Sequence, residues 1–194
     1  MCGVCGCQEL MIPLAAEEPR LANTARVIHA PDSQARRVAV ERSLLDHNRA
    51  HAESLAKRLA ERGIDAIGIL GGPGAGKTAL LEATFQHFGR EEAAREAVVE
   101  GDCATDFDAR RIAAKGARVA QVATGSLCHL DAHLVEHALD DLDLSGVSRL
   151  WIENVGNLVC PAHYDLGEAA RVVLLSVTEG EDKPLKYPPM FHSA

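Results

Sequence analysis

The residues with the clearest chemical meaning lie between Gly71 and Thr78, where the sequence reads Gly-Gly-Pro-Gly-Ala-Gly-Lys-Thr. An apolar run precedes this segment and a helix-forming run follows it, which is the setting in which G-x-x-x-x-G-K-[ST] binds phosphate. Glycines let backbone N–H groups turn toward a polyphosphate, and the start of the helix adds partial positive charge. Lys77 is expected to bridge the outer phosphates, and the Thr78 hydroxyl to ligate Mg²⁺. The segment predicts a nucleoside triphosphate site built from Gly71, Gly72, Gly74, Ala75, Gly76, Lys77 and Thr78.

Three thiols stand within the first seven residues, where Cys2, Cys5 and Cys7 alternate with glycines and a valine. The spacing C-x-x-C-x-C lets the sulfurs face one centre, and it suits a soft or borderline metal such as nickel, zinc or copper. A backbone nitrogen or the α-amine could complete a four-coordinate site, square-planar for Ni²⁺ or tetrahedral for Zn²⁺. The alternative is a terminus with redox-labile cysteines. We favour the metal, because a terminus without a role seldom concentrates thiols.

Two further apolar runs end on acidic residues. The run 97–102 ends on Asp102, and the run 148–153 ends on Glu153, with Gly156 three positions later. Open α/β sheets place ligand-binding groups at the carboxyl ends of strands. Nucleotide hydrolases use such an acid to hold Mg²⁺ or its water, and such a glycine N–H to meet the γ-phosphate. Asp108 lies in a polar segment, 105–115, that resembles a switch region.

Cys128 and His129 are adjacent in the segment before a helical run that extends to about residue 143. We expect them at the N-terminus of that helix, where the pKa of a thiol is lowered toward the thiolate. Cys160 follows the strand that ends on Glu153 and precedes a proline.

Other histidines recur at helical spacing. His129, His133 and His137 form a stripe along the predicted helix, and such a stripe alone is a solvated face more often than a metal site. His47 and His51 lie one turn apart in a helix predicted over 33–62. They could hold a metal, but a polar helix face is the simpler interpretation.

Composition and length limit the kind of protein. The chain has 194 residues, with 20 Lys and Arg against 28 Asp and Glu, so a broad nucleic-acid footprint is not expected. It has neither a long apolar run nor a signal-peptide pattern, which predicts a cytoplasmic protein without membrane association. We expect a flexible Cys-rich N-terminus and linker over 1–32, a leading helix over 33–63 that Gly63 ends, and a nucleotide-binding domain over 64–194.

Taken together, these strings resemble the HypB family, the nickel-incorporation GTPases of [NiFe]-hydrogenase maturation. Besides the phosphate loop and the Cys-rich start, the matching runs cover 100–102, 128–132, 152–161 and 176–188. The resemblance implies an α/β P-loop NTPase fold of the dimer-activated class, with a mostly parallel sheet flanked by helices. Within that class, a glutamate at position 153, where an aspartate is commoner in other nucleotide hydrolases, is expected.

The resemblance also implies roles for individual residues. Lys77, Asp102 and Glu153 would serve catalysis, with Asp102 and Glu153 as the Mg²⁺-associated acids and Asp108 as a switch acid. A second group would bind nickel or zinc at a nucleotide-dependent homodimer interface: Cys128, His129 and Cys160. The family's high-affinity nickel motif corresponds to Cys2, Cys5 and Cys7.

The function implied is GTP hydrolysis by a nickel metallochaperone that acts with hydrogenase maturation partners on the hydrogenase large subunit. Two alternatives stay open: a P-loop kinase for a small molecule, and a nickel- or zinc-binding protein with an impaired nucleotide site. The 194 residues contain no N-K-x-D, the family motif that reads guanine. The chain is therefore expected to be C-terminally truncated relative to the family, and its preference for GTP comes from the resemblance alone.

Overall fold

A computed structural model describes residues 34–102 and 105–194, with backbone only for 34–40. The predicted site at Cys2, Cys5 and Cys7 and the linker of 1–32 therefore lie outside the described residues. The chain divides into two compact units, residues 1–42 and 43–194. The described part of the first unit is the beginning of helix α1, Gln34–Glu61. No helix among the described residues is both long and apolar enough to cross a membrane.

The second unit is built on a parallel sheet. Within the described residues the sheet has five strands in the order β3-β2-β4-β1-β5, and every neighbouring pair is parallel. The strands are β1 (Asp65–Gly71), β2 (Glu96–Asp102), β3 (Arg118–Ala123), β4 (Arg149–Glu153) and β5 (Ala170–Leu174). All carboxyl ends meet at one edge, so the sheet gathers the predicted ligand groups there.

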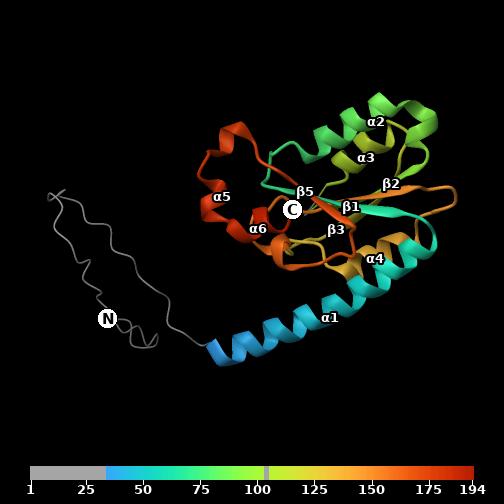
Figure 1. Ribbon diagram of the computed structural model, residues 1–194. Helices are drawn as coiled ribbons and strands as arrows, with labels where there is room; N and C mark the ends of the chain where they lie inside the picture. The colour runs from blue at the N-terminus through green and yellow to red at the C-terminus, as the bar shows by residue number, and fades with distance from the viewer. Residues whose placement is uncertain (1–33, 103–104) are drawn as a thin grey trace. The chain divides into compact units, whose positions relative to one another are not determined.

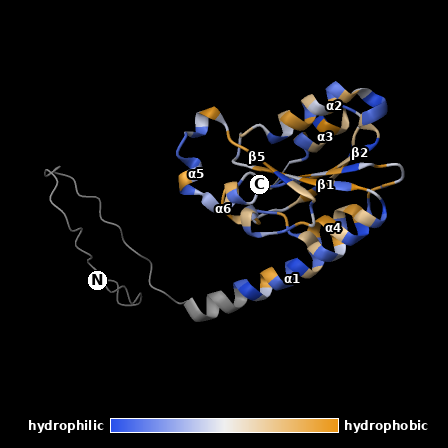
Figure 2. Cartoon of the chain, in the orientation of Figure 1, coloured by the Kyte–Doolittle hydropathy of each residue, from blue (hydrophilic) through white to orange (hydrophobic). Residues whose placement is uncertain are grey.

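Helices cover both faces of the sheet (Figure 1). On one face lie α2 (Lys77–Ala93) and α3 (Phe107–Ala113), which bury Leu81, Phe85 and Ile112. On the other face lie α4 (Ala132–Asp140) and α1, where Leu55 packs with Val135. Figure 2 shows hydrophobic residues concentrated on the strands and mixed with polar ones along the helices. This confirms the predicted α/β fold with a mostly parallel sheet flanked by helices.

Short helical segments complete the unit after β4. They are the 3-10 turns η1 (Cys160–His163) and η2 (Val177–Glu179) and the helices α5 (Lys183–Lys186) and α6 (Pro188–His192). β5 ends at Leu174, and Ser176 caps η2 with its side chain. Met190 of α6 is fully buried, so the last described helix is packed into the unit.

Some helix boundaries match the sequence predictions and others differ. Gly63 ends α1 in a left-handed conformation, φ 67°, as expected. Gly89 has φ 76° and kinks α2, but the helix resumes and runs to Ala93. The segment expected to be a polar switch, 105–115, contains the helix α3. α4 begins only at Ala132, because the Asp131 side chain accepts from the N–H of Leu134 and caps it there.

Candidate functional site: a phosphate loop beside a thiol and imidazole cluster

The phosphate loop connects β1 directly to α2. Gly74 and Gly76 have φ of 77° and 96°, in the left-handed region that favours glycine, so the loop can turn sharply before the helix begins. The Lys77 side chain folds back over the loop, with Nζ 3.4 and 3.3 Å from the carbonyl oxygens of Gly71 and Gly72. Backbone N–H groups, a helix start and a buried ammonium therefore share one small volume, which is the chemistry that a polyphosphate requires.

A cavity of about 410 Å³ opens beside the loop. Its floor is the carboxyl edge of β2 and β4, so the predicted acids Asp102 and Glu153 line it together with Asp108 and Gly156. Sequence reasoning assigned no role to Glu100, Arg111 or Asn154, which also line it. The structure thus brings the predicted phosphate-binding and acidic residues into one site.

Carboxylates surround the hydroxyl of Thr78. Its Oγ1 lies 2.7 Å from Oε1 of Glu153 and 3.1 Å from Oδ2 of Asp108. One hydroxyl hydrogen can satisfy only one of these oxygens at a time. Within the described residues, the buried second oxygens of Glu153 and Glu100 have no hydrogen-bond partner. A hard divalent cation such as Mg²⁺ takes oxygen ligands of this kind, so the residues present fit it.

Burial and mutual repulsion set the charge of this group. Glu100 is 2% exposed, and burial, followed by the charges of Glu153, Asp102 and Asp108, raises the pKa of its carboxyl to about 8. Burial also raises the pKa of Glu153 and lowers the pKa of the Lys77 ammonium, although the neighbouring acids oppose that lowering. The site therefore holds more carboxylates than it can keep ionised without an added cation.

Ion pairs and close packing fix the position of the acids. Arg111 lies 2.6 Å from Oδ1 of Asp108 and also pairs with Glu82 on α2, which ties α3 to the phosphate-loop helix. A Cβ at Gly156 would lie 2.8 Å from Cα of Pro73, so only glycine allows the segment after β4 to approach the phosphate loop this closely. Asp102 accepts a hydrogen bond from Thr105, 2.8 Å away.

A second cluster of ligand atoms lies on the loops beyond the same sheet edge. Cys128, His129 and Cys160 place their sulfur and nitrogen atoms within 4.8 Å of one another. The two sulfurs are 2.8 Å apart without a disulfide, and Sγ of Cys128 is 3.7 Å from Nδ1 of His129. Thiolate and imidazole suit nickel or zinc, and three ligands leave a coordination position for a fourth.

The environment of this cluster differs from the sequence expectation in one respect. Cys128 and His129 precede α4 instead of lying in its first turn, so the expected helix N-terminus effect on the thiol has no structural basis. The contact with Cys128, together with burial, raises the pKa of the Cys160 thiol. Burial lowers the pKa of His129, whose ring lies 3.9 Å from that of Tyr164, centroid to centroid.

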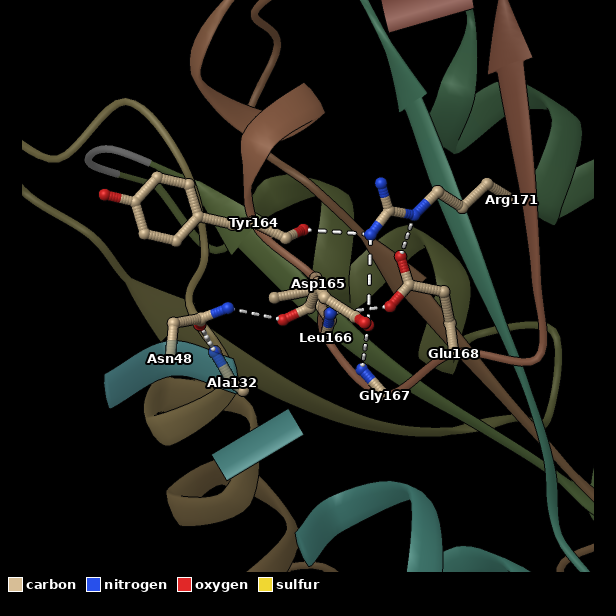
Figure 3. A network of polar contacts seen from close by, with 8 residues as sticks. All are labelled: Asn48, Ala132, Tyr164, Asp165, Leu166, Gly167, Glu168 and Arg171. Carbon is tan, nitrogen blue, oxygen red and sulfur yellow. Dashed lines mark hydrogen bonds and ion pairs between the residues drawn. The ribbon is translucent and has the colours of Figure 1, made fainter. Parts of the chain in front are cut away.

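A polar network holds the two loops that carry these ligands (Figure 3). Asn48 of α1 is 5% exposed, and its side chain donates to the carbonyl of Asp165 at 2.7 Å and accepts from the N–H of Ala132 at 2.8 Å. Arg171 of β5 donates to the carbonyl of Tyr164 at 3.1 Å. Asn48 thus joins the start of α4 to the loop after η1. Its role depends on contacts across more than 80 residues, which a motif search does not detect.

Asn157 links the two clusters. Its backbone N–H donates to the carbonyl of Gly71 at 3.1 Å, at the entrance to the phosphate loop. Its side-chain amide donates to the carbonyl of Cys128 at 3.2 Å. The same segment connects Glu153 to Cys160 along the chain. A displacement of the phosphate loop can therefore reach Cys128 through the single residue Asn157.

The parallel sheet, the glycine-rich loop and the acids at its edge define a P-loop nucleotide-binding protein. Residues 65–176 match the family model described as CobW/HypB/UreG, nucleotide-binding domain. The hydrogenase maturation factor HypB of Rhizobium leguminosarum bv. viciae is 50% identical over 168 residues, which cover 86% of this chain and 56% of that protein. The hydrogenase/urease maturation factor HypB of Helicobacter hepaticus is 40% identical over 180 residues, 90% of this chain and 72% of that protein.

Solved structures agree with these matches. The crystal structure of HypB from Helicobacter pylori in complex with nickel aligns with a TM-score of 0.70 at 42% identity, covering 76% of this chain and 69% of that chain. HypB from Archaeoglobus fulgidus aligns with a TM-score of 0.69 at 41% identity, covering 77% and 71%. The chain belongs to the HypB family. It spans about half the length of the curated Rhizobium and Azotobacter relatives that it matches.

Proposed function

We propose that this chain is a GTP-hydrolysing nickel metallochaperone domain that acts in [NiFe]-hydrogenase maturation. The observation that carries the proposal is the position of Asn157, which contacts Gly71 of the phosphate loop and Cys128 of the thiol cluster. A site of this kind can couple the state of a nucleotide to the affinity for a metal, because both ligands would bias the same segment.

The phosphate chemistry follows from the residues around the cavity. Lys77 and the loop N–H groups would stabilise the charge that develops on the γ-phosphoryl as water attacks in line. Thr78 and Glu153 would hold Mg²⁺ together with the predicted acid Asp102, and Asp108, which also contacts Thr78, is a further candidate. The ion would supply positive charge against the phosphates. Gly156 packs against the phosphate loop and lines the cavity, and its N–H is the proposed donor to the γ-phosphate. The preference for guanine rests on kinship with the HypB family.

Nickel is the proposed cargo of the thiol cluster. The HypB of Helicobacter pylori was crystallised with nickel, and the ligand set of Cys128, His129 and Cys160 suits nickel, with zinc as a competitor of similar preference. Cys2, Cys5 and Cys7 are proposed as a second, high-affinity nickel motif, and they lie outside the described residues.

A homodimer would complete the thiol cluster. Leu127 and Val159 are 46% and 51% exposed, and each stands next to a ligand in the sequence. Apolar side chains exposed beside an incomplete metal site favour a surface that a second copy covers in the nucleotide-bound state. Hydrogenase maturation partners and the hydrogenase large subunit are the proposed recipients of the nickel.

The test measures free phosphate released from GTP and, separately, from ATP, with Mg²⁺ and the 194-residue chain. Release from GTP in excess of ATP, abolished by Lys77→Ala, is expected, because that substitution removes the ammonium at the phosphate loop. Release at the same rate from Lys77→Ala would refute hydrolysis at this site. A phosphorylated small molecule in place of free phosphate would instead support a kinase. Nickel binding without turnover would indicate an impaired nucleotide site.

A further inference from the structure

Imidazoles from two helices converge on one carboxylate. The helices are α1 and α4, which lie along the same face of the sheet (Figure 1). His51 belongs to α1, whereas His133 and Glu136 belong to α4. Their ligand atoms all lie within 4.8 Å of one another. Nδ1 of His51 is 2.5 Å from Oε2 of Glu136, and the rings of His51 and His133 are 4.9 Å apart, centroid to centroid.

Two more imidazoles extend this group along the helices. The His47 ring is 4.7 Å from that of His51, and the His137 ring is 4.6 Å from that of His133. Residues four apart on a helix are neighbours, so helical spacing alone explains both of these pairs. It does not account for the meeting of His51 with His133, which requires the two helices to be packed side by side. A merely solvated helix face gives no reason for imidazoles of different helices to face one carboxylate.

The backbone beneath the group is fixed by packing. Leu55 of α1 and Val135 of α4 are fully buried in the same hydrophobic cluster. Further along the two helices, Arg58 and Asp140 form an ion pair at 2.8 Å. The three ligand side chains therefore stand on helices whose separation is already set, which lowers the entropic cost of bringing them to one ion.

The ligand set has a recognisable preference. Two imidazoles and a carboxylate suit Zn²⁺, Ni²⁺ and neighbouring divalent ions, and a water or a fourth side chain commonly completes such a site. Ligand atoms around a tetrahedral zinc lie about 3.4 Å apart, as bonds of about 2.1 Å require. No separation here exceeds that by more than about 1.4 Å, and His133 is exposed, so rotation of its side chain can close the site.

We propose that His51, His133 and Glu136 form a binding site for a divalent late first-row transition ion. The site is separate from the one at Cys128, His129 and Cys160, and it joins α1 to α4 within one chain. It does not depend on the proposed nucleotide chemistry. The competing explanation is that His51 and Glu136 form only an interhelical ion pair.

The test uses the full 194-residue chain in which serine replaces all six cysteines, with its fold checked by circular dichroism. Zn²⁺ and, separately, Ni²⁺ are titrated by calorimetry, and the melting temperature is measured with and without each ion. We expect one equivalent to bind and to raise the melting temperature. The cysteines replaced are Cys2, Cys5, Cys7, Cys103, Cys128 and Cys160.

Single variants in this background assign the ligands. His51→Ala and His133→Ala are each expected to weaken binding about tenfold or more, the order of loss seen even for outer-shell changes at metal sites. Glu136→Gln keeps an oxygen for the contact with His51 but is a poorer ligand, so it is expected to lose affinity while keeping the metal-free melting temperature. The exposed His87 on α2 supplies the matched control, and His87→Ala is expected to bind as the parent does.

Two results would overturn the proposal. One is no binding by the cysteine-free parent at its native fold. The other is unchanged affinity in Glu136→Gln and in the double variant His51→Ala/His133→Ala, which would leave the ion pair as the whole explanation.

Discussion

Replacing Glu100 by glutamine should stabilise the metal-free protein, and more so at higher pH. Glu100 is almost fully buried, one of its oxygens has no partner among the described residues, and its pKa is raised to about 8. An acid whose pKa is raised by folding contributes its full stability below the unfolded pKa of 4.5 and loses it as the pH rises toward 8. Glutamine stays neutral at every pH and does not incur this loss.

The size of the stability difference follows from the shift in the Glu100 pKa. Each pKa unit corresponds to about 1.4 kcal/mol, so wild type loses up to about 5 kcal/mol between pH 4.5 and pH 8, and about 3 kcal/mol of that by pH 7. Glu153, Asp102 and Asp108 contribute to the raised pKa of Glu100, so removal of its charge relieves them as well. The difference between variant and wild type should therefore be small at pH 5, below about 1 kcal/mol, and largest at pH 8.

The assay is urea unfolding of both proteins in EDTA at pH 5, 7 and 8. Other titrating groups largely cancel in the difference between the two proteins. Glu91→Gln is the control, because Glu91 is exposed on α2 and the same substitution there removes a carboxylate away from the cavity. A Glu100→Gln effect that is equal at pH 5 and pH 8 would refute the account of this carboxylate.

Further predictions concern packing around the two clusters. Gly156→Ala should weaken nucleotide binding about fivefold or more in a fluorescent-nucleotide titration, because its Cβ would press on the backbone of Pro73 and overpacking costs about 1–3 kcal/mol. Unchanged affinity would contradict this reading. Asn48→Ala should lower the free energy of unfolding by about 1–3 kcal/mol, since it leaves the buried Ala132 N–H without its acceptor and removes the part-buried bond to the Asp165 carbonyl. Asn48→Asp should lose at least as much in the same urea titration at pH 7, because it buries a carboxylate oxygen against the Asp165 carbonyl in place of the amide donor; a smaller loss than in Asn48→Ala would count against this assignment.

The parts of the fold that local sequence determines were predictable. The phosphate loop, the left-handed Gly63 and the acids Asp102 and Glu153 at strand ends each follow from residue type and nearest neighbours. The family resemblance supplied Cys128, His129 and Cys160 as a group, and the structure places them together.

The remainder depends on contacts between distant segments. Glu100 lies within an apolar strand, and the register with β4 places it level with Glu153, where it lines the cavity beside the phosphate loop. Arg111 acquires its role because α3 packs on α2, and Asn48 because α1 reaches the loop after η1. The histidines looked like two separate polar faces, since the packing of α1 against α4 could not be read from either helix alone.

The central claim, that nucleotide state controls nickel affinity at the thiol cluster, is tested most directly by a nickel titration. The protein should carry serine at Cys2, Cys5 and Cys7 and alanine at His51 and His133, so that Cys128, His129 and Cys160 dominate the binding. It should be loaded with either GDP or a non-hydrolysable GTP analogue. The account predicts dissociation constants that differ about fivefold or more, as expected for a coupling of 1 kcal/mol or greater, with the difference reduced by Asn157→Ala. Equal dissociation constants in the two nucleotide states would contradict it.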